Sequence, residues 1–235
     1  AWSRVLGRWD RIFELANTLN VPVMIDAEES WIQNSIDTLT YEMMAMFNER
    51  EAIIFNTFQM YRVDMLGNLT NAIKSAKDQH YFLGVKLVRG AYLEKERQRS
   101  HEENYSEPLH KNKHDTDRDF NAAVDLCLHN LETVYFCVGT HNEESCVLLC
   151  DKMNALGIST NHPQIHFAQL LGMSDNISYN LAHFGYNVAK YVPYGPIESV
   201  MPYLFRRAEE NSSIAGQTSR EFALIKKEVN RRKLI

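Results

Sequence analysis

Two adjacent arginines near the C-terminus are the side chains in this sequence that most clearly suggest a binding chemistry. Residues 202–213 read PYLFRRAEENSS, so Arg206 and Arg207 precede Glu210 by four and three residues. On a helix these spacings put the side chains on one face, where the carboxylate would orient either guanidinium. A guanidinium pair held in this way would bind a carboxylate or a phosphate. A solvated helix with ordinary ion pairs is the alternative interpretation.

Aromatic residues precede this pair in the sequence. Tyr203 lies three residues before Arg206, and Tyr191 and Tyr194 occur in the preceding segment KYVPYG. A small carboxylate bound by the arginines would therefore have aromatic rings to pack against its apolar part.

The elements that must position these side chains are predicted from short apolar runs. The runs rich in β-branched and aromatic residues are 21–28, 52–61, 82–92, 134–142, 165–173 and 188–195, and each is predicted to be a strand. Amphipathic helical patterns lie between them, for example at 30–49, 67–80 and 143–157, where Gly157 is a predicted C-cap. Alternating strands and helices predict a parallel sheet.

Polar residues at the strand ends decide between two parallel folds. In a barrel the carboxyl ends of all strands converge on one mouth, whereas a doubly wound sheet concentrates function at one switch point with a glycine-rich turn. The sequence has neither G-x-G-x-x-G nor a P-loop. We therefore predict an α/β fold, a (β/α)8 TIM-type barrel, over residues 1–235 as a single catalytic domain. Only six strand–helix units are found, so the first one or two units of the barrel are expected to be absent from this chain.

Composition narrows the function classes. The formal net charge is −5 and the pI about 6.0, which argues against nucleic acid as a partner. No apolar run reaches the length of a membrane span. The four cysteines lack C-x-x-C spacing and are expected to be buried thiols. The histidines lack ligand spacing, so no metal site is predicted. The charged segment 93–120 is predicted to be a solvated helix followed by a loop over the barrel mouth.

The segment IDAEES contains a further candidate. Asp26 and Glu28 are in phase on a strand, and the sequence alone does not determine which face they occupy. We favour a place in the site for Asp26. Glu28, Glu29 and Ser30 are expected to cap the helix that follows.

Taken together, the strand-end motifs resemble those of the proline dehydrogenase family. The matching segments are IDAEE, FQMY, GVKLVRGAYLEKER, VGTHN, QLLGM, YVPYG and PYLFRRAEEN, in this order. The resemblance implies a flavin-dependent (β/α)8 barrel that oxidises L-proline to Δ1-pyrroline-5-carboxylate, with FAD as cofactor. Lys86 stands where many bacterial members of the family have arginine. A lysine at this position is similar to the eukaryote-like branch.

The resemblance also implies residue roles. Arg206 and Arg207 would bind the proline carboxylate with Glu210 orienting them. Tyr191, Tyr203 and Leu170 would contact the substrate ring, and the implied catalytic residues are Asp26, Lys86 and Tyr191. The implied FAD-binding residues are Gln59, Lys86, Val88, Gly90, Ala91, Tyr92, Thr140, His141 and Asn142.

Several alternatives stay open at this point. Tyr191 is bulky where the hydroxyproline-preferring branch has a small serine, which favours proline over hydroxyproline. A cofactor-free lyase or aldolase would use the same arginines with Lys86 or Lys190 as an imine-forming lysine, and an incomplete barrel could instead serve as a binding module. The family further suggests quinone as electron acceptor and peripheral association with a membrane. The location of the protein would be the cytoplasm with inner-membrane contact, or the matrix side of the mitochondrial inner membrane.

Overall fold

The computed structural model describes residues 2–213 and 215–233, and it divides into two compact units, residues 1–191 and 192–235. The first unit contains all six strands: β1 (Val23–Ile25), β2 (Ile54–Gln59), β3 (Leu83–Val88), β4 (Val134–Gly139), β5 (Ile165–Leu170) and β6 (Val188–Tyr191). Its helices are α1 (Trp2–Leu19), α2 (Ser30–Phe47), α3 (Met65–Gln79), α4 (Leu93–Glu102), α5 (Lys113–Leu128), α6 (Glu143–Ala155) and α7 (Asp175–His183). The second unit contains α8 (Ile197–Ser213) and α9 (Ala215–Lys233).

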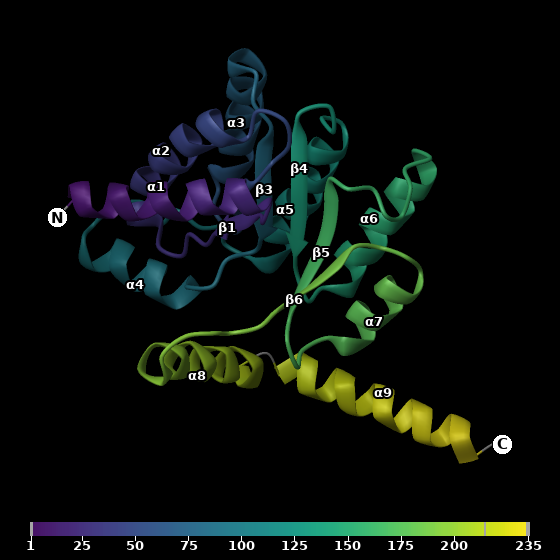
Figure 1. Cartoon of the computed structure of the whole chain (residues 1–235). Coiled ribbons are helices and arrows are strands. Elements are labelled where there is room, and N and C mark those ends of the chain that lie inside the picture. Colours follow the sequence, from purple (N-terminus) through teal and green to yellow (C-terminus); the bar gives the residue numbers. More distant parts are fainter. Residues whose placement is uncertain (1, 214, 234–235) are drawn as a thin grey trace. The chain divides into compact units, whose positions relative to one another are not determined.

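The six strands form one parallel sheet in which each strand pairs with its sequence neighbours, in the order β1 to β6. Each observed strand lies within its predicted run, and helices connect consecutive strands around the sheet (Figure 1). The curled sheet therefore confirms an α/β half-barrel. The described residues show six strands, so the complete eight-stranded barrel and the single domain stay predictions.

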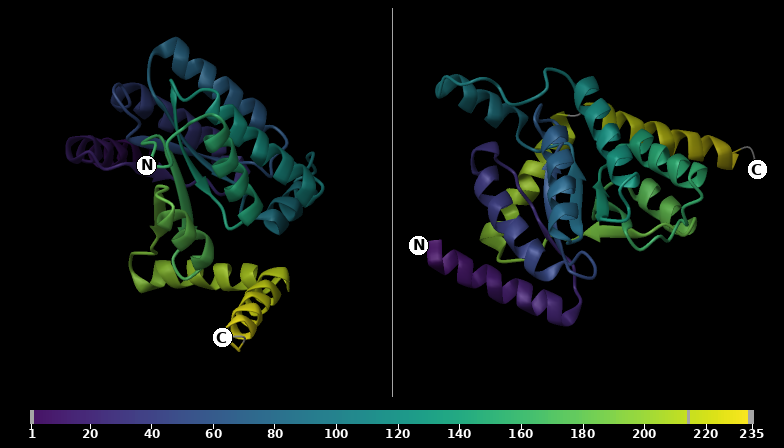
Figure 2. Two further views of the ribbon diagram at one scale, coloured as in Figure 1. Left: turned by 90° about the vertical axis from the view of Figure 1, so that its right-hand side faces the viewer. Right: turned by 90° about the horizontal axis from the view of Figure 1, so that it is seen from above.

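One face of the sheet forms the hydrophobic core. Alternate residues such as Leu83, Val85 and Leu87 on β3 are completely buried against the helices. Helices α3 and α5 contact each other and pack on β3 (Figure 2). The periodicity of two in the strands and of 3.6 in the helices thus puts the apolar residues on facing surfaces.

The opposite, inner face carries the residues between these positions. They include Met24, Thr57, Lys86, Cys137 and His166, which alternate with core residues along their strands. Because successive residues of a strand point to opposite faces, this set shares one surface. Any chemistry at the strand ends must therefore use this inner surface and the loops that follow it.

The charged segment 93–120 folds as a helix, a loop and the start of a second helix, as α4 and α5 show. The prediction that its first helix is solvated is only partly right, since Glu96 and Ser100 of α4 are buried. The loop returns to the segment that follows β2, where Leu109 forms an isolated antiparallel bridge with Arg62.

The second unit is helical. Pro202 lies inside α8, which precedes α9 in the same unit. Among the described side chains of α9, Phe222, Ile225 and Val229 are exposed. No described helix combines the length and apolar character that crossing a membrane requires.

Candidate active site

An ion pair on the inner face of the sheet joins two of the predicted catalytic residues. The Nζ atom of Lys86, on β3, donates to Oδ1 of Asp26, directly after β1. Between them on β2, Thr57 Oγ1 donates to the Ile25 carbonyl at 2.7 Å and lies 3.3 Å from Asp26 Oδ1. Asp26 therefore occupies the inner face, as the sequence analysis favoured.

The row of inner residues continues past Lys86 with two titratable groups. Cys137 on β4 is paired in register with Lys86, and His166 on β5 with Cys137. Burial raises the pKa of the Cys137 thiol to about 12 and lowers the pKa of His166. The thiol is therefore protonated at neutral pH, which makes it a poor nucleophile.

Small side chains cover the inner face beyond this row. Gly139 pairs with Ala168, and Ala168 pairs with Ala189 on the next strand. A Cβ added to Gly139 would lie 3.2 Å from Val88 Cγ1 and 3.6 Å from Lys86 Cε. We call Gly139, Ala168 and Ala189 the apolar floor; the side chains of Val88 and Lys86 lie beside Gly139.

A contact within the protein requires a glycine at position 90. Its φ of +128° is unfavourable for other residues, and an added Cβ would lie 2.4 Å from ring atoms of Tyr61. The backbone N–H of Tyr61 donates to the carbonyl of Arg89 at 2.7 Å. The close approach seen at Gly90 is thus to the Tyr61 ring, and its predicted contact with a flavin stays a prediction.

The side chain of Arg89, the residue before Gly90, connects three elements of the fold. Its guanidinium bonds Asp117 Oδ1 at 2.7 Å, Thr140 Oγ1 at 2.8 Å and Ser145 Oγ at 2.9 Å, and it lies 4.3 Å from the ring centroid of Phe120. Burial alone would raise the pKa of Asp117, but the hydrogen bonds from Lys113 and Arg89 bring it below its ordinary value. The connection fixes the ends of β3 and β4 relative to α5.

The predicted flavin residues after β4 have structural partners. Asn142 is the N-cap of α6, and its side chain accepts the Ser145 N–H at 2.8 Å. His141 Nδ1 lies 3.0 Å from Ser174 Oγ. Thr140 is buried and accepts from Arg89. These residues surround the end of β4, next to the apolar floor.

Gln59 occupies a buried place at the end of β2. Its Nε2 donates to the carbonyl of Glu28 at 3.1 Å and lies 3.4 Å from Gln33 Oε1. Ala91 and Tyr92 follow Gly90 in the half-buried loop before α4, and Tyr92 Oη donates to Glu28 Oε2 at 2.7 Å. The predicted set is therefore brought together in two groups, around β1–β3 and around β4.

Leu170 and Tyr191 are paired in register at the ends of β5 and β6. Tyr191 is 44% exposed on the inner side. The adjacent Lys190 turns the other way, and its Nζ donates to Met173 O and to Asp175 Oδ1, each at 2.8 Å. Lys190 is thereby removed from the inner face, which weakens its case as an imine-forming lysine.

The remaining predicted residues lie on α8, in the second unit. The Arg207 guanidinium carbon is 5.1 Å from the Tyr203 ring centroid, which confirms that a ring and a guanidinium share one helix face. The side chains of Arg206 and Glu210 lie outside the described part of the structure. Their predicted contacts stay predictions.

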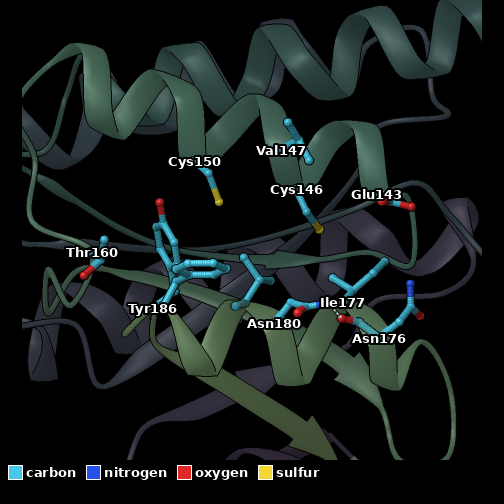
Figure 3. A pocket seen from close by; sticks show the side chains of 11 residues that line it. Glu143, Cys146, Val147, Cys150, Thr160, Asn176, Ile177, Asn180 and Tyr186 are labelled. Atoms are coloured by element: carbon cyan, nitrogen blue, oxygen red, sulfur yellow. Dashed lines mark hydrogen bonds between the residues drawn. The ribbon is translucent and has the colours of Figure 1, made fainter. Parts of the chain in front are cut away.

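A cavity of about 370 Å³ lies elsewhere, between α6 and α7 (Figure 3). Its apolar wall includes Cys146, Cys150 and Tyr186, and it shares no residue with the predicted set. Burial raises the pKa of both thiols and that of Tyr186, so these groups are protonated near neutral pH. Neither Asp26 nor Lys86, the two members of the ion pair, lines this cavity.

Three residues near the site were missed by the sequence analysis. Thr57 contacts Asp26, Arg89 connects β3 to β4, and Glu96 caps α2. A polar Asn-Thr pair inside a strongly apolar run was the available signal for Thr57. Glu96 corrects an expectation, since the α2 N-cap residue Glu29 makes no side-chain capping bond and Glu96 supplies it from another helix.

Comparison with known proteins identifies the family. The profile described as proline dehydrogenase matches residues 3–220. The chain belongs to the proline dehydrogenase family. This membership favours an oxidoreductase over the cofactor-free lyase or aldolase.

Individual relatives of this family agree. Proline dehydrogenase 1, mitochondrial, of Homo sapiens is 40% identical over 98% of the chain, which spans 39% of that protein. Hydroxyproline dehydrogenase of Xenopus laevis is 37% identical over 96% of the chain, which spans 49% of it. The chain thus spans less than half the length of each of these two curated relatives.

A solved structure supports the fold. The proline utilization A protein of Bdellovibrio bacteriovorus, inactivated by N-propargylglycine, superposes with a TM-score of 0.86 at 22% identity. The superposition covers 94% of this chain and 23% of that one. The half-barrel therefore has the same α/β architecture as part of that protein.

Proposed function

We propose that this chain is the catalytic part of a flavin-dependent proline dehydrogenase that oxidises L-proline to Δ1-pyrroline-5-carboxylate. The observation that carries the proposal is the Asp26–Lys86 ion pair on the inner face at the strand ends. It lies where barrels of this class place their reacting groups, and the family match covers its residues.

The residues present fit a flavin, proposed to be FAD. The floor of Gly139, Ala168 and Ala189 would accommodate a planar ring system, because side chains larger than methyl are absent from these three positions. The Lys86 ammonium lies beside this floor and is suited to stabilise negative charge on a reduced ring. Bound FAD would accept the hydride that proline loses, which carries both electrons of the oxidation, while a proton leaves the ring nitrogen.

The further residues proposed to hold FAD come from the two groups described above, around β1–β3 and around β4. They are Gln59, Val88, Gly90, Ala91, Tyr92, Thr140, His141 and Asn142.

The substrate contacts are proposed from the family motif. Arg206 and Arg207 would hold the proline carboxylate by paired hydrogen bonds, so that the ring carbon next to nitrogen faces the flavin. Glu210 would orient the guanidiniums. Tyr203, Leu170 and Tyr191 would enclose the apolar ring, which explains why aromatic residues accompany the arginines.

Asp26 and Lys86 would organise the charge in this site. The Asp26 carboxylate fixes the position of the Lys86 ammonium, and Thr57 fixes the carboxylate. Tyr191 limits the space around the substrate and excludes water from that side. These residues orient and stabilise, while the redox step belongs to the cofactor.

The electron acceptor and the location are proposed by analogy. Quinone and peripheral membrane association follow from the family resemblance. The name of the human relative includes a mitochondrial location, which favours the mitochondrial inner membrane over a bacterial cytoplasmic location with inner-membrane contact.

Hydroxyproline oxidation is a second candidate, because the Xenopus laevis relative is named for it. The bulky Tyr191 at the end of β6 favours proline, since a hydroxyl on the substrate ring would need the space that Tyr191 fills.

A visible absorption spectrum, followed by anaerobic addition of L-proline, tests the proposal. We expect a flavin spectrum that bleaches with L-proline and is unchanged by D-proline. A protein that stays colourless after reconstitution with FAD, or a flavin spectrum indifferent to L-proline, would contradict the proposal. Borohydride trapping of a covalent adduct at Lys86 would support the lyase instead.

A further inference from the structure

Helix α4 and its N-cap residue Tyr92 contact four consecutive residues around the N-terminus of α2, in matching order. Glu28, Glu29, Ser30 and Trp31 are contacted by Tyr92, Lys95, Glu96 and Arg99, respectively. We call these eight residues the clasp. The strands that lead into its two halves, β1 and β3, are not neighbours, because β2 lies between them.

Glu96 is the centre of the clasp. It is completely buried, and its Oε1 and Oε2 accept hydrogen bonds from the Ser30 N–H at 2.7 Å and the Ser30 hydroxyl at 2.6 Å. A buried carboxylate is costly unless its oxygens are bonded. Here it meets the N-terminus of α2, where a negative charge is favoured.

The outer contacts reinforce this centre. Tyr92 Oη donates to Glu28 Oε2 at 2.7 Å, and Lys95 Nζ donates to Glu29 Oε1 at 2.8 Å. Lys95 Nζ and Arg99 Cζ lie 5.4 Å and 4.5 Å from the Trp31 ring. Exposed ion pairs contribute little individually, so the buried Glu96 carboxylate is the member expected to matter most.

The clasp and the Asp26–Lys86 pair connect the same two strands. Asp26 follows β1 and precedes Ser30 by four residues, while Lys86 lies on β3, which leads through a short loop to α4. Any separation of α4 from the start of α2 would therefore move the segment that carries Asp26. The ion pair itself is half open to water on its Asp26 side, with 49% of that side chain exposed.

We propose that the clasp holds Asp26 in register with Lys86, with Glu96 as its positioning residue. This inference rests on the proposed function for its catalytic consequence. Glu96 acts through Ser30 and the segment before it, whereas Asp26 and Lys86 belong to the reacting site. Displacement of a catalytic group by about 1 Å is enough to cost roughly a hundredfold in rate.

Hydrogen–deuterium exchange tests the mechanical part without any catalytic readout. In Glu96→Ala the amides of residues 26–30 should exchange at least about tenfold faster, since the Ser30 N–H loses a charged acceptor. Glu96→Gln retains the shape and one acceptor, so it should restore most of the protection. Glu94→Ala is the matched control, because Glu94 is an exposed carboxylate in the first turn of the same helix.

A double-mutant cycle tests the catalytic part. Glu96→Gln should lower kcat with proline by about three- to tenfold and Glu96→Ala by ten- to a hundredfold, with little change in KM. In an Asp26→Asn background the Glu96 substitutions should have almost no further effect, because the pair that they position is already lost. A purely structural role would give independent, multiplicative effects.

Failure of the clasp proposal can be distinguished from failure of the proposed function. Unchanged exchange at residues 26–30 in both Glu96 variants, or multiplicative effects in the cycle, would overturn the clasp proposal even if the wild type oxidises proline. A wild type without proline oxidation would overturn the proposed function and, with it, the catalytic consequence. Should Glu96→Ala not fold, the double-mutant cycle with Glu96→Gln still decides the proposal, because multiplicative effects there would overturn it.

Discussion

Lys86 and Asp26 form their ion pair across an intervening strand, with Thr57 of that strand within 3.3 Å of the carboxylate. Lys86 lies on β3, Thr57 on β2 and Asp26 directly after β1, so the arrangement exists only when the sheet is assembled. The pair is therefore a property of the tertiary fold, and it is the part of the site that the strands alone determine.

Replacing Lys86 by Met should lower kcat/KM for proline by about a hundredfold or more, because the substitution removes the cation placed beside the developing charge. Stopped-flow reduction of bound flavin measures the loss directly. Lys74→Met on the exposed side of α3 is the matched control. Wild-type flavin reduction in Lys86→Met would refute a role for this ammonium.

Replacing Arg207 by Lys should raise the KM for proline and lower kcat/KM about ten- to a hundredfold, since a lysine cannot form the paired hydrogen bonds of a guanidinium. Steady-state kinetics measure both constants. Arg231→Lys, on the exposed surface of α9, should have no effect. Equal changes in the two variants would argue for a general effect of charge.

Substituting Tyr191 with Ser should shift preference towards hydroxyproline, because a smaller side chain makes space for the extra hydroxyl. The measured quantity is the ratio of kcat/KM for hydroxyproline to that for proline, and a rise of about tenfold is expected from contacts of this size. Tyr194→Ser is the control, since Tyr194 is fully exposed. An unchanged ratio in Tyr191→Ser would remove the basis for the assignment of specificity.

His166 should make stability depend on pH. Burial lowers its pKa below the ordinary 6.5, so the unfolded state binds a proton more readily than the folded state. The resulting stability is present above about pH 6.5 and is lost as the pH falls through the folded-state pKa.

Urea unfolding at about pH 7.5 and about pH 5.5 checks the sign. The difference in free energy of unfolding between these pH values should be smaller in His166→Gln than in the wild type. His114→Gln, with 89% of the side chain exposed, should behave as the wild type does. A larger difference in His166→Gln would mean that the imidazole is stabilised in its charged form.

The order of strands and helices was predictable from the sequence because hydrophobic period is a local property. All six strands lie within their predicted runs, and the helix predicted to be capped at Gly157 has its C-cap one residue earlier, at Leu156, with Gly157 following at a φ of +67°. The face occupied by Asp26 was not predictable, since a period of two leaves both faces equivalent. Only packing of Val23 and Ile25 against the core decides it.

Contacts between distant segments account for what the sequence analysis missed. The N-terminus of α2 was expected to be capped by its own residues, yet its acceptor is Glu96, which lies 66 residues after Ser30. Local patterns identify side chains able to cap, but they do not identify a cap that arrives from another helix. The charged composition of α4 likewise predicted solvent exposure and concealed its one buried carboxylate.

The contact between Tyr61 and Gly90 has a consequence for sequence variation. The ring of Tyr61 occupies the space of a Cβ at position 90, and the positive φ there directs the chain into α4. The two positions should therefore vary together among homologues, with glycine kept at 90 wherever an aromatic ring stands at 61. A single change at either position would alter the direction in which the chain leaves the sheet towards α4. Related sequences that keep the path of this loop should therefore keep a compatible pair of residues at positions 61 and 90.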